Sequence, residues 1–447
     1  MAKKKKTVKK KTTKKKVTKK KVTAKKASSK KGRQVQKQEI KNKTNFASLG
    51  SRSEFSYFLG CPPIDIPLGL GARSGKIYEF HGVGDEDKGS GVGKSSMGVA
   101  LAIAFCDYWI SRGVKNFKLL WIETESAFDV DRVTYMRPDL REFFVIEEAE
   151  TVEDASELMH QTIKDCVAEE KKCFIVWDTL AAAVTRAQKD SGDAYAGGQM
   201  EVPRKLRQML RSLTPLLGKT GTPLVLINQT YESTVKKFVG GRFIEKRVKT
   251  PYGGGGVIYH SSVMMEMMKR GSITTMMKNG EERETGILVQ IKPYKNKMVG
   301  VKEPFLIEIK NEGGLDYFGT MVRYLTDHQL LKMSGSWKTV KYPIGYFKKG
   351  QRQKFTEFSF QSIPKLEQEV EERPHLKEWF EYLIYDHFAS MYPLMKCKMI
   401  SKIWKYEKRF FGEVITELTD HERKVAAAIE KDLKKKQERE EKQDEED

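Results

Sequence analysis

Short apolar runs separated by helix-length segments set the rhythm of the chain beyond residue 76. The runs predict strands at residues 77–81, 118–122, 143–146, 173–177, 224–228, 262–267, 287–292 and 305–309. The early runs are almost continuously apolar and alternate with helical segments, which is typical of βαβ crossovers in a buried parallel sheet. The later runs follow one another after short connections, so we expect that edge of the sheet to be antiparallel. The pattern predicts an α/β fold with a mainly parallel, twisted sheet.

Helix boundaries are marked by capping residues and glycine. One helix should begin at Lys94 and end at Gly113. A second should begin at Thr151, because Asp154 three residues later completes a capping pattern. A third is predicted for residues 203–217, which begin with a proline suited to a first turn.

Composition divides the chain into four parts. Residues 1–44 form a Lys-rich tail with almost no large apolar side chain, so we expect it to be disordered. Residues 45–333 carry the strand and helix pattern, and we take them as the core. From about Ser334 aromatic and basic residues increase and a helical pattern spans residues 364–411, which predicts a smaller C-terminal domain at 334–431. Residues 432–447 are a charged tail that ends in acidic residues.

The net charge of +22 belongs to the N-terminal tail. Residues 1–43 hold 21 of the 82 Lys and Arg residues and one of the 60 Asp and Glu residues, which leaves 61 against 59 for everything after. A tethered polycation binds nucleic acid through counterion release, without reading sequence. A solubilising arm or a localisation signal is the alternative.

Two compartments are disfavoured by the sequence. No apolar signal region follows the tail and no run of 18 apolar residues occurs, so we expect neither secretion nor a membrane-spanning helix. The five cysteines are scattered without metal-ligand spacing, which is typical of reduced thiols inside a cell. We therefore expect a cytoplasmic, DNA-associated protein, or a nuclear one if the source is eukaryotic.

A glycine-rich turn between a strand and a helix predicts a phosphate site. In such a loop, backbone N–H groups and the helix N-terminus cradle phosphates, Lys94 reaches the β- and γ-phosphates of ATP, and Ser95 offers its hydroxyl to Mg²⁺. The candidate contacts are Gly82, Gly91, Gly93, Lys94, Ser95 and Ser96. The match is imperfect, because Lys88 stands where the motif has its first glycine. Counting from Gly82 instead leaves six extra residues, three of them acidic.

Polar residues follow three further strands. Asp178 ends an apolar run, a position from which a carboxylate holds the metal's water shell. Glu125 is the candidate to orient the attacking water, since we expect its strand to lie beside the strand before the glycine-rich turn. Glu123 is its rival, two residues away and on the same face of a continued strand. Gln229 is suited to sensing a γ-phosphate through a hydrogen bond.

At these residues the chain resembles the RecA family of recombinases, over roughly residues 64–338. The segment from Glu125 to Asp129 is similar to the family's catalytic-glutamate segment, which selects Glu125 over Glu123 and implies that Asp129 contacts the adenine. Arg132 departs from the family, which often has an aromatic there. Residues 227–229 resemble the segment that couples ATP to the second DNA-binding loop. Lys295 and Lys297, followed by Pro304-Phe305, resemble lysines that reach a neighbouring subunit's ATP.

The resemblance implies two DNA-binding loops. Residues 230–256 are expected to be a long loop in which cations follow a nucleic-acid backbone, aromatics stack on bases and glycines allow close approach. Residues 186–200 would form the smaller partner loop. The candidate DNA contacts are Tyr195, Gly197, Gly198, Lys236, Lys237, Phe238, Arg242, Phe243, Lys246, Arg247, Gly253 and Gly254.

The expected function is ATP-dependent pairing of homologous DNA. The chain would form helical homo-oligomeric filaments on single-stranded DNA and exchange strands with double-stranded DNA, with ATP and Mg²⁺ as cofactors. Lys94, Glu125, Gln229, Lys295 and Lys297 are the candidate catalytic residues. Two alternatives stay open: a ring-forming helicase or accessory motor ATPase, and a DNA-coating protein that does not turn over ATP.

Overall fold

The structure is a computed structural model, and it describes residues 55–83, 91–128, 130–192, 200–239, 242–276 and 280–431. The side chains of residues 130, 132, 134, 235–237, 239, 243, 244, 246 and 247 lie outside this description. The expected tails at 1–44 and 432–447, and the acidic residues within 84–90, lie outside it too. All described residues belong to one unit, Gly50–Asp447.

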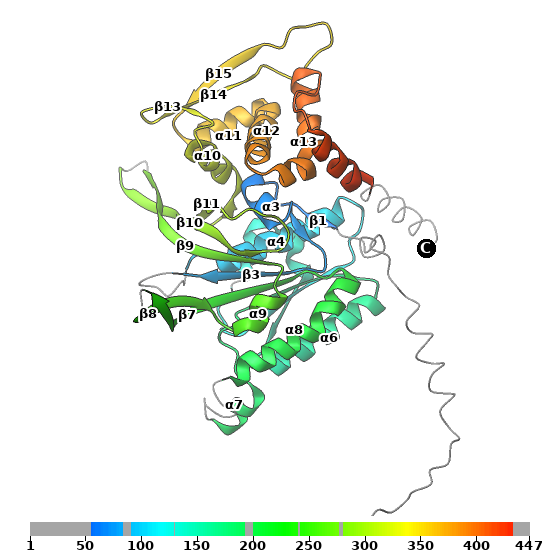
Figure 1. The fold of residues 1–447 in the computed structure, drawn as a ribbon, viewed down its shortest axis with the longest axis vertical. Coiled ribbons are helices and arrows are strands. Elements are labelled where there is room, and N and C mark those ends of the chain that lie inside the picture. Colours follow the sequence, from blue (N-terminus) through cyan, green and yellow to red (C-terminus); the bar gives the residue numbers. More distant parts are fainter. Residues whose placement is uncertain are drawn as a thin grey trace, which may run out of the picture. The chain divides into compact units, whose positions relative to one another are not determined.

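The central sheet follows the order β12-β11-β10-β9-β3-β7-β6-β4-β5, with β8 paired to β7 (Figure 1). Its parallel part consists of β3 (Ile77–Gly82), β4 (Phe117–Glu123), β5 (Phe144–Glu148), β6 (Lys172–Asp178), β7 (Leu224–Val239) and β9 (Val263–Met276). Antiparallel pairing continues through β10 (Glu282–Asn296), β11 (Phe305–Lys310) and β12 (Gly314–Asp316). Every predicted strand exists, and the antiparallel edge is confirmed.

Alternate residues of the central strands feed two separate cores. Trp121 of β4 packs with α4 (Lys94–Ile110), whereas Leu120 and Ile122 pack with α6 (Val152–Ala168) and α8 (Glu201–Thr220) on the other face. Successive side chains of a strand point to opposite faces, so an unbroken apolar run buries both. Each large side chain buried this way contributes about 1.5–3 kcal/mol.

The predicted helices are confirmed, together with the cap at Thr151. The Thr151 hydroxyl accepts a hydrogen bond from the backbone N–H of Asp154 at 3.1 Å. Shorter elements complete the core: β1 (Ser56–Tyr57), α3 (Pro62–Leu68), β2 (Ala72–Arg73), α5 (Val130–Met136), η2 (Pro138–Phe143), α7 (Arg186–Ser191), α9 (Gly254–His260) and α10 (Tyr317–Asp327).

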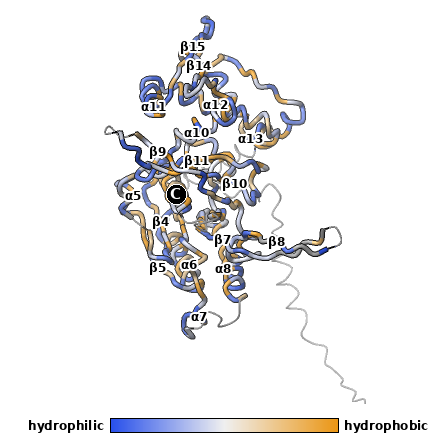
Figure 2. The backbone as a smooth tube through the Cα atoms, turned by 90° about the vertical axis from the view of Figure 1, so that its left-hand side faces the viewer, coloured by the Kyte–Doolittle hydropathy of each residue, from blue (hydrophilic) through white to orange (hydrophobic). Residues whose placement is uncertain are grey.

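The prediction of a long loop at residues 230–256 is wrong. Residues up to 239 extend β7, and β8 (Arg242–Pro251) pairs with them antiparallel from Thr230 with Pro251 to Val239 with Arg242. Figure 2 shows this hairpin extending away from the rest of the sheet. The physical reason is visible in the sequence, where β-branched and aromatic residues are frequent on both sides of Gly240-Gly241, a strong two-residue hairpin signal.

The region after residue 331 forms a sheet and helices. Strands β13 (Lys332–Ser334), β14 (Trp337–Pro343) and β15 (Phe355–Phe360) form a sheet that the strand predictions did not include. The helical pattern is confirmed as α11 (Ile363–Glu372), α12 (Pro374–Met391) and α13 (Pro393–Phe411), two of which begin at a proline. One apolar cluster runs from Tyr57 to Phe410, so these helices share a core with the main sheet. A domain boundary at 333/334 stays a prediction.

Candidate functional site

Four strands bring the nucleotide candidates to one edge of the sheet. Gly82, Asp178 and Gln229 lie at or near the carboxyl ends of the core parts of β3, β6 and β7, and Glu125 follows β4. The carboxyl ends of parallel strands are where an open α/β sheet binds ligands. The prediction that β4 lies beside β3 is wrong, because β7 and β6 lie between these two strands. Strand order depends on crossovers that the local sequence does not encode.

The glycine-rich turn has the geometry of a phosphate cradle. Gly91 and Gly93 adopt left-handed backbone angles, with φ of 63° and 82°, and Gly93 caps the N-terminus of α4. A β-carbon at Gly93 would also collide with Ile309, so glycine is required there twice over. The turn lines a cavity of about 310 Å³ that continues to Asn311. Backbone N–H groups at a helix N-terminus and a cavity of this size fit the phosphates of a nucleotide.

Ser95 and Asp178 meet inside this site. The Ser95 hydroxyl donates to Asp178 Oδ2 at 2.6 Å. Burial raises the pKa of Asp178 to about 6, although the Ser95 hydrogen bond opposes this shift. Burial also lowers the pKa of Lys94, while the charges of Asp178 and Glu125 act in the opposite direction. A hydroxyl and a carboxylate in contact are suitable oxygen ligands for Mg²⁺ and its waters.

Glu125 and Gln229 are brought together, whereas Glu123 is separated from them. Gln229 Nε2 donates to Glu125 Oε1 at 2.8 Å, and the Glu125 side chain is exposed. Glu123 is only 5% exposed. The structure therefore gives the two predicted rivals different environments, with Glu125 open to an incoming water and Glu123 buried beneath the turn.

A buried polar network lies behind Gln229, and the sequence did not reveal it. Asn228 Nδ2 donates to Glu79 Oε1 at 2.7 Å and to the Tyr252 carbonyl at 3.1 Å, while Asn228 Oδ1 accepts from the backbone N–H of Gln229 at 2.8 Å. The other oxygen of Glu79 contacts His81 Nδ1 at 2.9 Å. Fully satisfied networks of this kind rigidify their surroundings. Gln229 is thereby fixed to the base of the hairpin.

Lys295 and Lys297 lie at the opposite end of the sheet. Lys295 Nζ donates to the carbonyls of Ile258, Tyr259 (3.2 Å) and Ser261 (3.0 Å), and Lys297 Nζ donates to that of Tyr259 at 2.6 Å. These carbonyls form the C-terminus of α9, where cations are favourable. Burial, followed by the charge of Lys297, lowers the pKa of Lys295 to about 8.

Two arginines that sequence reasoning missed add to this cationic end. Arg207 and Arg211 of α8 are exposed and form no ion pair within the described part of the chain. Both lie near His260, whose pKa is lowered by burial and then by the surrounding cations, Arg207, Arg211, Lys295 and Lys297. Their four-residue spacing on the polar face of an amphipathic helix was the available signal. We call these four cations, with Tyr259 and His260, the cationic cluster.

The candidate DNA contacts are only partly described. Tyr195, Gly197 and Gly198 lie outside the described residues, as does the adenine candidate Asp129. The side chains of Lys236, Lys237, Phe243, Lys246 and Arg247 lie outside them as well. On the hairpin, Phe238 is 65% exposed and Arg242 is exposed.

Gly253 and Gly254 have a packing role in addition to the predicted one. Gly253 caps α9 with φ of 88°, and a β-carbon there would lie 2.6 Å from Val257 Cγ2. Gly254 also has a left-handed φ, of 65°. These glycines allow α9 to turn tightly against α8, and their contact with DNA stays a prediction.

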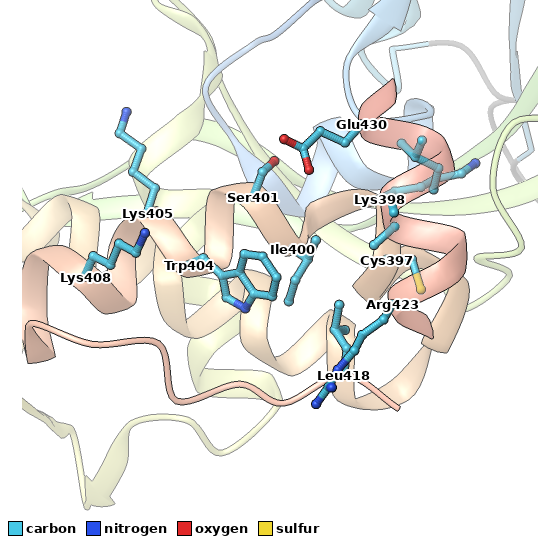
Figure 3. Close-up of a pocket in the computed structure, with 13 residues that line it drawn as sticks. Cys397, Lys398, Ile400, Ser401, Trp404, Lys405, Lys408, Leu418, Arg423 and Glu430 are labelled. Carbon is cyan, nitrogen blue, oxygen red and sulfur yellow. The ribbon is translucent and has the colours of Figure 1, made fainter. Parts of the chain in front are cut away.

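A second cavity lies elsewhere in the molecule. It occupies about 510 Å³ between α13 and the helix that begins at residue 420, and Trp404, Ile400 and Leu418 contribute to its wall (Figure 3). None of the candidate nucleotide or DNA residues lines it. Among the described helices, none is long and apolar enough to cross a membrane.

Comparisons with known proteins find relatives in one family. The model of the RecA N-terminal domain family matches residues 34–314. Protein RecA of Leifsonia xyli is 28% identical over 283 residues, covering 63% of this chain and 70% of the relative. Protein RecA of Deinococcus radiodurans is 26% identical over 345 residues, covering 76% of this chain and 85% of the relative. Protein RecA of Arthrospira platensis is 25% identical over 320 residues, with 70% and 76% covered.

Proposed function

Because the chain belongs to the RecA family, we propose that it is a DNA-dependent ATPase that forms helical filaments on single-stranded DNA and catalyses homologous pairing and strand exchange with double-stranded DNA. Lys94 and the turn around Gly93 would hold the phosphates, and Ser95 and Asp178 the magnesium ion. Mg²⁺ neutralises charge on the phosphate oxygens when it is bound.

The hydrogen bond between Gln229 and Glu125 carries this proposal. Gln229 belongs to the strand that continues into the hairpin, and Asn228 ties that strand to the hairpin's base at Tyr252. DNA bound along the exposed side of the hairpin would shift Gln229 and release Glu125 to orient the attacking water. ATP turnover would thus respond to DNA through one continuous element.

The positions of Lys295 and Lys297 favour assembly. Lys295 pairs with Met264 on β9, and Met264 lies level with Glu79 near the start of β3, whereas the glycine-rich turn follows the end of β3. The remaining residues of β3 and the turn itself therefore place Lys295 on the order of 10–20 Å from the phosphate site of its own subunit. These lysines can therefore serve the phosphates of another subunit, supplying positive charge in trans.

The test is ATP hydrolysis with and without single-stranded DNA, comparing the wild type with Lys94→Ala. We expect stimulation of about tenfold or more in the wild type and at least about a 100-fold loss in the variant. Lys115→Ala, at an exposed lysine just after α4, is the matched control and should behave as the wild type.

Electron microscopy of the same samples separates the alternatives. Open helical filaments on single-stranded DNA support the proposal. Closed rings would point to a hexameric motor, and DNA binding without any hydrolysis would point to a coating protein.

A further inference from the structure

Glu123 is folded beneath the turn that carries Glu125. Its Oε1 accepts hydrogen bonds from the backbone N–H groups of Glu125, at 3.2 Å, and Ala127, at 3.3 Å. Between these two residues, Ser126 adopts a left-handed φ of 51°, which non-glycine residues seldom do. A conformation of this kind persists only when its surroundings hold it. The Glu123 carboxylate provides two of the hydrogen bonds that hold it.

The other oxygen of Glu123 is left without a donor. Oε2 is buried and has no hydrogen-bond partner in the part of the chain that the structure describes. Two other buried glutamates in the described part of the chain use both oxygens. Glu407 accepts from the N–H groups of Ile415 and Thr416 on separate oxygens, and Glu79 contacts Asn228 and His81 in the same way. An orphaned buried oxygen requires an explanation beyond anchoring.

The location of Glu123 suggests where the missing donor comes from. Glu123 lies directly opposite Asp178 on the neighbouring strand β6. Asp178 in turn contacts Ser95 of the glycine-rich turn. A donor entering with a magnesium-bound nucleotide, such as a coordinated water, would arrive beside these two carboxylates.

We propose that Glu123 is a positioning residue for Glu125. One oxygen holds the turn in the conformation that directs Glu125 at the phosphate, and the other accepts a hydrogen bond from a water that enters with the magnesium nucleotide. The inference rests on the proposed function, because that function gives Glu125 its role. Thr124 is tied separately to β6, through Asp178 O and Trp177 Nε1, so Glu123 controls mainly residues 125–127.

A double-mutant cycle tests the positioning role in steady-state ATP hydrolysis with single-stranded DNA. Glu125→Gln should lose about 1,000-fold, within the range for a general base. Glu123→Ala should lose about 30-fold in kcat with KM changed less than about threefold. Glu123→Gln keeps an oxygen that accepts the same N–H groups and should stay within about fivefold of the wild type. The double variant Glu123→Ala, Glu125→Gln should be no slower than Glu125→Gln alone.

A binding measurement tests the second oxygen. The affinity for a fluorescent methylanthraniloyl ATP analogue is compared in Mg²⁺ and in EDTA. Glu123→Gln should lose about fivefold of the affinity gained with Mg²⁺ and nothing in EDTA. Glu148→Ala, which alters the exposed residue paired with Glu123 on β5, is the matched control. Thermal unfolding verifies that each variant is folded.

Several outcomes would overturn the inference. If Glu123→Gln is as slow as Glu123→Ala while Glu125→Gln stays active, Glu123 itself is the base. If the two losses add in the double variant, Glu123 is only structural. If Glu123→Gln binds the analogue as the wild type does, the second oxygen has no role. If the single variants Glu125→Gln and Glu123→Gln are both fully active, the result would instead contradict the proposed function.

Discussion

The two ends of the central sheet differ in charge and in the partners of their polar side chains. At the carboxyl end, Ser95 is bonded to Asp178 and Gln229 to Glu125, so the polar groups hold one another in place. At the amino end, the cationic cluster is bonded to no acidic side chain in the described structure. Its lysines donate to helix carbonyls, and Tyr259 is 72% exposed. The carboxyl end is therefore arranged like a binding site, and the amino end like an interaction surface.

This difference indicates that neither end is complete alone. Two lysines, Lys94 and Lys310, line the cavity of the carboxyl end, and Lys310 is already paired with Asp316 at 2.9 Å. A nucleotide would bring several negative charges to these two cations. The amino end has the cations that such a charge would need, but the sheet keeps them away. A head-to-tail contact between copies, which joins unlike surfaces, would bring the two ends together and would generate a filament unless it closed into a ring.

The largest expected effect comes from inactivating the two ends of the sheet in two different variants. Lys94→Ala removes a lysine of the carboxyl end, and Lys297→Ala removes a lysine of the amino end. Each variant alone should lose at least about 100-fold of DNA-stimulated ATPase activity. Mixed in equal amounts, they should recover about one quarter of the wild-type rate, because about one interface in four would pair an intact turn with an intact Lys297. The measurement is ATP hydrolysis across a range of mixing ratios.

Recovery should follow a bell-shaped curve with its maximum at equal amounts. If no ratio exceeds the sum of the two separate rates, the ends do not meet between subunits. Mixing Lys94→Ala with Lys115→Ala controls for dilution, and its rate should rise in proportion to the Lys115→Ala fraction.

The carboxyl end could be read from the sequence far better than the amino end. Lys94 and Ser95 follow a glycine-rich turn, Asp178 ends an apolar run, and Thr151 is a local capping signal, so neighbouring residues alone revealed them. The roles of Asn228 and Arg207 depend on which strand and helix become neighbours, and no local pattern encodes this. The hairpin was not predicted for another reason: its many charged residues and glycines are equally typical of a nucleic-acid-binding loop.

A second, intermediate effect concerns the link between Gln229 and the hairpin. Gln229→Ala removes the hydrogen bond to Glu125, so Glu125 should no longer respond to DNA. Because Glu125 is then released without DNA, we expect the basal ATPase rate to rise about tenfold, toward the DNA-stimulated rate, and the ratio of the two rates to fall to about one; hydrogen bonds to charged groups contribute about 1.5–3 kcal/mol. Gln208→Ala, at an exposed glutamine of α8, is the control. Normal stimulation in Gln229→Ala would show that DNA acts by another route.

The smallest expected effect is a pH dependence that belongs to the amino end alone. Burial and then the charge of Lys297 lower the pKa of Lys295 to about 8. Both lysines act on His260, together with Arg207 and Arg211. Above pH 8 Lys295 loses the charge that would serve a neighbour's phosphates, so DNA-stimulated ATPase activity should fall severalfold between pH 7 and pH 9. Lys295→Arg should flatten this fall, because arginine stays charged.

Folding stability should move in the other direction over the same pH range. A lysine with a pKa near 8 in the folded protein and about 10.4 in the unfolded chain makes the unfolded state bind more protons between these values. Its contribution to the free energy of unfolding therefore rises as pH increases through that window. A loss of activity without a lower melting temperature at pH 9 would assign the effect to charge at the amino end. An equal loss in Lys295→Arg would remove Lys295 as its cause.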